Sequence, residues 1–191
     1  FLNAIDNADE NNLVEIISKY TSENFNMKCT HPFNELEGAD KIAKYLWSPI
    51  KKSFKPIQRR MDIFYAGTNL VDNHSSKWVV NMGHLLGSFN NPFFGIEPTK
   101  KTVMLWYCEF YKVENNKITE GAFFLDILKF MQHLKLSVVP DSTGMIGFNP
   151  GPKTHDGLYF EKQSDEEGNK TLDLMMRMAN RLIGEGMRTT V

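Results

Sequence analysis

Two acidic residues stand among aromatic and aliphatic residues in the stretch from position 102 to 134, and they are the first candidates for chemistry. Glu109 lies in the run Trp106-Tyr-Cys-Glu-Phe-Tyr111, and Asp126 directly follows Phe-Phe-Leu. A carboxyl group in an apolar cavity has its charged form disfavoured, so its pKa rises and it can exchange a proton near neutral pH. Neighbouring tyrosine hydroxyls could donate hydrogen bonds to an enolate. The pattern therefore indicates general acid/base chemistry on a small molecule.

Each acid also has a structural interpretation. Aspartate is favoured at helix N-caps, where its side chain accepts backbone N–H bonds, and Asp126 stands just before the predicted short helix Ile127–Leu134. Glu109 could pair with a lysine or arginine, and Glu120 could lie at the solvent rim, since most acids are exposed or paired. The sequence leaves Asp126 open to both roles.

A predicted β-hairpin positions these residues. Two strands, 102–113 and 117–125, are joined by the turn dipeptide Asn115-Asn116, which tolerates positive φ. With a two-residue turn the facing pairs are Val113–Ile118, Tyr111–Glu120, Glu109–Ala122 and Tyr107–Phe124. Alternation then predicts one pocket-like face with Tyr107, Glu109, Tyr111, Glu120 and Asp126, and one core face with Met104, Trp106, Cys108, Phe110, Phe123 and Leu125. A turn longer or shorter by one residue would reverse the relation between the strands.

The candidate site residues follow from this hairpin and from the strand before it. We predict Asp126 and Glu109 as catalytic groups, and as substrate-binding residues Tyr107, Tyr111, Phe124, His84 and Glu120. His84 is a lone histidine in the strand 78–89, where a satisfied structural histidine is the alternative. The other histidines show no metal-ligand spacing, so no metal site is predicted.

The remaining elements indicate an α+β protein, with helices first and a curved antiparallel sheet after them. Helices are predicted for 9–25 and for 39–47, with Pro49 ending or kinking the second. Strands are predicted for 61–66 and 78–89, with bulges or bends at Gly83 and Gly87. We predict a domain over 1–139, a linker over 140–160 and a C-terminal helix within 161–191. That helix, 165–183, either begins a second copy of the domain or docks on the same core.

Composition restricts the class of protein. A net charge of −1 gives no basic excess for nucleic acid or an anionic membrane. No apolar run reaches the roughly 18 residues needed to span a bilayer, and no leader pattern is visible. The two cysteines, far apart in the chain, are predicted to be reduced, which favours a cytoplasmic protein.

Several segments, taken in order, resemble the SnoaL-like polyketide cyclase (ester cyclase) family of the NTF2-like superfamily. The segments are Trp47-Ser-Pro-Ile50, Gly87-Ser-Phe89, Phe94-Gly-Ile-Glu-Pro-Thr99, Tyr111-Lys-Val113, Lys117-Ile-Thr-Glu120 and Asp126-Ile-Leu-Lys-Phe-Met-Gln132. The resemblance covers roughly residues 1 to 140. It implies a cone-shaped α+β fold in which a strongly curved sheet wraps round helices and encloses a deep apolar cavity.

The resemblance also implies a function. Asp126 matches the aspartate that serves as acid/base in a cofactor-free intramolecular aldol closure, while 121–125 lacks the Trp or His that the family often has there. We therefore expect a cofactor-free cyclase, isomerase or hydrolase acting on a hydrophobic small molecule, and a homodimer. The alternative is a non-catalytic ligand-binding or dimerisation module, in which Asp126 caps a helix and a basic residue neutralises Glu109.

Overall fold

The computed structural model describes residues 1–136, 140, 143–144, 150–158, 161 and 164–185. The chain divides into two compact units, Phe1–Gly157 and Leu158–Val191. The predicted C-terminal helix is confirmed as α6 (Asp165–Glu185), which belongs to the second unit. The predicted linker lies partly outside the described residues, and a second copy of the domain stays a prediction. None of the described helices is both long and apolar enough to cross a bilayer.

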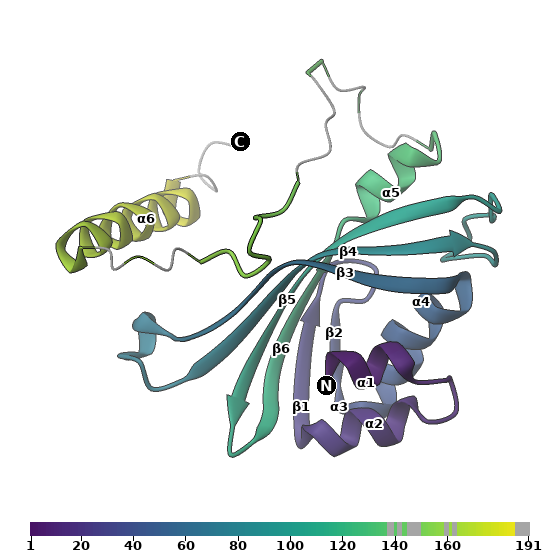
Figure 1. Ribbon diagram of the computed structural model, residues 1–191, viewed down its shortest axis with the longest axis horizontal. Helices are drawn as coiled ribbons and strands as arrows, with labels where there is room; N and C mark the ends of the chain where they lie inside the picture. Colours follow the sequence, from purple (N-terminus) through teal and green to yellow (C-terminus); the bar gives the residue numbers. More distant parts are fainter. Residues whose placement is uncertain (137–139, 141–142, 145–149, 159–160, 162–163, 186–191) are drawn as a thin grey trace. The chain divides into compact units, whose positions relative to one another are not determined.

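The first unit is built on one curved, unclosed sheet of six strands. Their spatial order is β2 (Glu35–Glu37), β1 (Thr21–Cys29), β6 (Lys117–Leu125), β5 (Thr102–Glu114), β4 (Lys77–Phe89) and β3 (Phe54–Thr68). Strand β1 runs parallel to β6, and the other neighbours are antiparallel. Figure 1 shows the first four helices gathered against one side of this sheet, which we call the inner face. The predicted α+β class is confirmed.

The helices of this unit cover the inner face and one end of the sheet. They are α1 (Leu2–Asn7), α2 (Leu13–Tyr20), α3 (Gly38–Ile42), the π-helical turn η1 (Ala43–Trp47), α4 (Ser48–Ser53) and α5 (Ile127–His133). The short η2 (Leu70–Asp72) lies in the connection between β3 and β4. In α2, Leu13 and Ile17 are buried one turn apart, as an amphipathic helix requires. Pro49 does not end the second predicted helix, because it stands in the first turn of α4, where its missing N–H is tolerated.

Two element predictions were wrong at their boundaries. The helix predicted for 9–25 ends at Tyr20, and residues 21–25 belong to β1, where Phe25 and Met27 are buried two apart in strand alternation. The strand predicted for 61–66 is the middle of the longer β3. Register shifts in β3 fall between Phe54 and Ile57 and between Met61 and Ile63. These lie opposite Gly87 and Gly83, so the predicted bulges exist, with the extra residues on the partner strand.

The hairpin of β5 and β6 has the predicted turn and a different register. Asn115 and Asn116 both have positive φ, and Val113 faces Ile118 as predicted. The register then shifts by one residue, because Lys112 faces Glu120 and leaves Thr119 as an unpaired extra residue. Every predicted pair beyond this bulge is therefore wrong by one: Tyr111 faces Gly121, Glu109 faces Phe123 and Tyr107 faces Leu125.

This bulge reverses the faces of β6. Glu120 and Phe124 do not share a face with Glu109; they lie with the half-buried Phe110 and Lys112 on the opposite, outer face. The predicted core face was wrong for its β5 residues Met104, Trp106, Cys108 and Phe110, which lie half-buried on the outer face, whereas Phe123 and Leu125 are buried as predicted. The buried residues of the inner face include Leu105, Tyr107, Glu109, Tyr111, Phe123 and Leu125.

An aromatic cluster fixes α5 at one end of the sheet. Phe130 is fully buried, with its ring 5.5 Å from that of Phe54, 5.3 Å from Phe89 and 6.0 Å from Phe93. Edge-to-face contacts at these separations add to the area that the rings bury. The cluster therefore sets where Asp126, at the start of α5, can lie.

Candidate functional site

Glu109 is fully buried on the inner face and has two polar partners. One carboxylate oxygen is paired with Nη1 of Arg59, and the other accepts a hydrogen bond of 2.7 Å from the hydroxyl of Tyr111. A buried carboxylate without such partners would cost several kcal/mol. The sequence left open that a basic residue neutralises Glu109. The structure shows this pairing, and the basic residue is Arg59.

Arg59 reaches Glu109 from β3 and is itself held on several sides. Its Nε donates to the Asp6 carboxylate at 2.9 Å, and its guanidinium carbon lies 5.4 Å from the ring centroid of Trp47 and 4.9 Å from that of Tyr107. The side chain is only 4% exposed. Arginine suits this position because its planar group pairs with carboxylates and stacks on aromatic rings at once.

Burial sets the protonation behaviour of this network. Burial raises the pKa of Glu109, while the charge of Arg59 and the hydrogen bond from Tyr111 act against the rise. Burial also acts to lower the pKa of Arg59, but the carboxylates of Glu109 and Asp6 outweigh it, so that pKa is raised. Glu109 therefore has an increased affinity for a proton, and Arg59 keeps its positive charge.

The two tyrosines beside Glu109 are held neutral. Burial raises the pKa of Tyr107 to about 12, and burial followed by the charge of Glu109 raises the pKa of Tyr111 well above its ordinary value. The Tyr107 hydroxyl donates to Oδ1 of the fully buried Asn81 at 3.2 Å. Both phenols therefore remain hydrogen-bond donors throughout the physiological pH range.

These shifts predict a loss of stability in alkali. The unfolded chain releases the tyrosine protons near pH 10, whereas folded Tyr107 retains its proton up to about pH 12. The native state therefore binds more protons in this interval, and stability falls as pH rises, by up to about 1.4 kcal/mol per pH unit for each tyrosine. Urea unfolding at several alkaline pH values measures the slope. Tyr107→Phe should reduce it, and Tyr45→Phe, at an exposed tyrosine, should not; equal slopes would refute the assignment.

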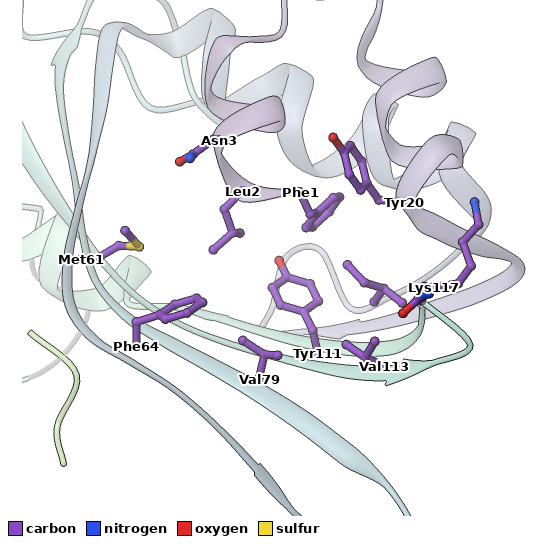
Figure 2. A pocket seen from close by; sticks show the side chains of 12 residues that line it. Phe1, Leu2, Asn3, Tyr20, Met61, Phe64, Val79, Tyr111, Val113 and Lys117 are labelled. Atoms are coloured by element: carbon purple, nitrogen blue, oxygen red, sulfur yellow. The ribbon is translucent and has the colours of Figure 1, made fainter. Parts of the chain in front are cut away.

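A pocket of about 400 Å³ opens directly above Tyr111. Figure 2 shows its upper wall from Phe1, Leu2 and Tyr20 and its floor from the sheet, with Tyr111 between Phe64 and Val113. Its lining is mostly apolar and aromatic, with a few polar groups at Asn3, Asn116 and Lys117. Such a composition is typical of a small-molecule site. Tyr111 is both a lining residue of the pocket and the hydrogen-bond partner of Glu109.

The structure brings together some of the predicted site residues and separates others. Glu109, Tyr107 and Tyr111 lie together on the inner face. Glu120 is exposed and pairs with Lys112 at 2.9 Å, and Phe124 is 50% exposed on the outer face. His84 also faces outward, with its Nδ1 3.6 Å from Asp62 and its ring against Trp106. The prediction that Tyr107, Glu109, Tyr111, Glu120 and Asp126 share a pocket-like face was wrong for Glu120, because of the bulge at Thr119.

Asp126 lies outside this group of residues as well. It is exposed, and its Oδ1 accepts a 2.9 Å hydrogen bond from the backbone N–H of Lys129, which makes it the N-cap of α5. The expectation that it shares a buried face with Glu109 was wrong. Its catalytic role stays a prediction of the sequence.

Asp126→Ala is expected to lower the free energy of unfolding by about 0.5–2 kcal/mol, the usual cost of a lost helix N-cap. The reason is that the N–H of Lys129 would lose its acceptor at the start of α5. Urea denaturation measures the loss, and Asp126→Asn, which keeps a capping oxygen, serves as the control. Equal stability of Asp126→Ala and the parent chain would contradict the capping role.

Three residues of the network were missed by the sequence reasoning: Asp6, Arg59 and Asn81. A signal existed for Arg59, which alternates with Ile57 and Met61 in β3 and thus stands at an inner position. Buried donor nitrogens without a described partner also occur here, on Arg59, Asn81 and Trp47. Among the described residues, no group of three or more His, Cys, Asp and Glu side chains could hold a metal ion.

Comparison with known proteins shows the fold. No family model matches the chain, and a search of curated proteins finds no match. Solved structures do match. A candidate polyketide cyclase from Acidithiobacillus ferrooxidans superposes with a TM-score of 0.56 at 15% identity, over 72% of this chain and 92% of that chain. A candidate SnoaL-like polyketide cyclase from Shewanella putrefaciens gives 0.53 at 16% identity, over 71% and 81%.

A third match is IdmH, a candidate polyketide cyclase from Streptomyces antibioticus, with a TM-score of 0.56 at 11% identity, over 70% of this chain and 91% of that chain. The first unit therefore has the NTF2-like cone fold of SnoaL-like polyketide cyclases, as the sequence resemblance predicted. At identities this low, the matches show a shared fold only. The chemistry depends on the residues of the site itself.

Proposed function

We propose that this chain, which has the fold of SnoaL-like polyketide cyclases, binds an apolar small molecule above Tyr111 and moves a proton between that ligand and Glu109. One observation carries the proposal: Tyr111 lines the pocket, and its hydroxyl donates at 2.7 Å to a fully buried carboxylate. A carboxylate whose proton affinity is raised by burial is a suitable general base at neutral pH.

The reaction class that fits is proton abstraction next to a carbonyl group, without a cofactor. The phenolic oxygen of Tyr111 accepts the proton from the ligand carbon as its own proton passes to Oε2 of Glu109. The C–H bond breaks, one O–H bond is exchanged for another at Tyr111, and the enolate forms while Glu109 becomes neutral. Return of the proton from Glu109 through Tyr111 to another carbon of a conjugated enolate completes an isomerisation. Attack of the enolate on a second carbonyl of the same ligand gives an alkoxide, and the return of the proton to that alkoxide oxygen completes a cyclisation.

Arg59 and Asp6 hold Glu109 in place, and neither residue lines the pocket above Tyr111. The Arg59 guanidinium fixes the orientation of the Glu109 carboxylate, so that Oε2 stays directed at Tyr111. Asp6 in turn holds Arg59. Arg59 is thus a positioning residue, and Tyr107 contributes through the stacking of its ring on Arg59.

The experiment measures deuterium exchange at the α-carbon of 2-tetralone, a neutral aromatic ketone, by NMR. We expect the protein to accelerate exchange about 100-fold or more over buffer, the lower range for general base catalysis. Glu109→Gln and Tyr111→Phe should each abolish this acceleration while retaining ketone binding, which the methyl resonance of Met61 in the pocket wall reports.

Two further variants decide between sites. Glu114→Gln changes an exposed acid of the same strand and should leave exchange unchanged. Asp126→Asn tests the acid that the sequence favoured, and loss of exchange in that variant alone would assign the chemistry to Asp126 and refute our proposal. If the protein binds the ketone but does not accelerate exchange, it is a non-catalytic ligand-binding module and the proposed proton transfer is wrong.

We also propose a homodimer formed through the outer face, because Met82 and Phe124 are 39% and 50% exposed there beside the half-buried Phe110. A second copy would remove this apolar area from water. A monomer in light scattering would refute it. The cytoplasmic location stays a proposal supported by the two free cysteines, Cys29 and Cys108.

A further inference from the structure

A groove lies where α5 meets the ends of β3, β4 and β5. It consists of two adjoining hollows of about 320 and 460 Å³, which share Leu86 and Thr102. Leu86 and Met104 are neighbours across β4 and β5 and face away from Glu109. No residue that lines this groove lines the pocket above Tyr111. The groove is therefore a separate site, and it is also distinct from the apolar patch around Phe124.

The first hollow has positive charge and an apolar floor. Lys101 and Lys135 line it together with His133, while Leu86, Met104 and Leu134 supply apolar surface. No aspartate or glutamate lines either hollow, and neither lysine forms an ion pair with any described residue. Since the whole chain carries a net charge of only −1, this charge is a local feature of the groove.

The backbone at Lys135 supports a role for its side chain. The N–H of Leu136 bonds to the carbonyl of Met131 at 2.9 Å, which closes α5 with the six-residue pattern of a Schellman motif. Lys135 occupies the left-handed position of that motif, with a φ of 60°. Glycine is the usual residue there, because a Cβ is unfavourable in this conformation. A lysine at this position is therefore less stable than a glycine would be, and such strained residues are often found at binding sites.

We propose that this groove binds an organic anion with an apolar body, whose carboxylate or phosphate group lies with Lys101 and Lys135. The apolar part would rest on Leu86, Met104 and Leu134, and the second hollow provides room for a longer chain. The first hollow alone has room for about ten heavy atoms, at roughly 30 Å³ for each water-sized group. Octanoate has this size and charge, and octyl phosphate and 1-octanol share its chain.

The test uses the full chain with ¹³C-methyl methionine and titrates these three compounds by NMR. Met104 reports on the groove and Met61 reports on the pocket above Tyr111. We expect octanoate or octyl phosphate to shift the Met104 resonance, and octanol to bind about tenfold more weakly. A preference between the two anions identifies the head group. If only Met61 shifts, or if octanol binds as tightly as the anions, the proposal is wrong.

Two substitutions test the recognition of charge. Lys101→Gln and Lys135→Gly should each weaken octanoate binding about three- to fivefold, the upper part of the range for an exposed charge pair, without changing octanol binding. Lys135→Gly should also leave the protein as stable or more so, because glycine fits the backbone there. Lys44→Gln, at a lysine that contacts Tyr45 elsewhere, is the control. Unchanged octanoate affinity in both groove variants would overturn the proposal.

Discussion

Arg59→Met is expected to lower the free energy of unfolding by about 3–5 kcal/mol at neutral pH, because it leaves the buried carboxylate of Glu109 without its counter-charge. Methionine keeps much of the apolar contact with Trp47 and Tyr107, so the loss reports mainly on charge. Urea denaturation measures it. The loss should shrink as pH falls, since a protonated Glu109 no longer needs a cation.

Matched variants separate this effect from a general effect of losing an arginine. Arg60→Met changes the next residue, which is exposed on the outer face, and should alter stability by less than about 0.5 kcal/mol. The double variant Arg59→Met/Glu109→Gln should recover a large part of the loss, because no buried charge is left uncompensated. If Arg59→Met costs less than about 1 kcal/mol at neutral pH, Glu109 does not depend on Arg59 as the structure indicates.

Gly83→Ala is expected to destabilise the protein by about 3 kcal/mol, the upper part of the range for overpacking. A Cβ at this position would overlap the carbonyl oxygen of Arg60 and would lie 3.1 Å from the backbone nitrogen of Asp62. Both atoms belong to the backbone of β3, so no side-chain movement can relieve the overlap. The two strands would have to separate at the bulge, close to where β3 carries Arg59.

Gly67→Ala is the control for this substitution. Gly67 also lies in β3, but a Cβ there meets no atom within 4 Å and its φ is not in the left-handed region. We expect a neutral or slightly stabilising effect, through the lower entropy of the unfolded chain. Thermal unfolding of the two variants side by side gives the comparison. Similar melting temperatures for both would show that the bulge does not need a glycine.

The local elements of the second half of the chain could be predicted to within a few residues. Strands β4, β5 and β6 and helices α5 and α6 follow from alternation, helical spacing and turn residues, which are all short-range signals. Asn115-Asn116 shows this directly, since both residues adopt the positive φ that their type favours. Strand β1 was not predicted, and its first residues, 21–25, were assigned to the preceding helix. The strand forms by pairing with β6 and β2, and the pairing with β6 is a long-range contact that overrides local propensity.

The sequence by itself determined that Glu109, Tyr107 and Tyr111 share one strand and that Asp126 begins α5. It also showed that the chain has enough apolar and aromatic residues to line a cavity. Tertiary structure decided which acid is buried. The bulge at Thr119 turns Glu120 and Phe124 outward, and a one-residue shift of this kind leaves no trace in the period-two pattern. Arg59 reaches Glu109 across 50 residues and an intervening strand, a contact that only the order of the strands in the sheet creates. Asp126 stays at the surface because the Phe130 cluster fixes α5 at the end of the sheet, whereas Glu109 is enclosed because the helices cover the inner face.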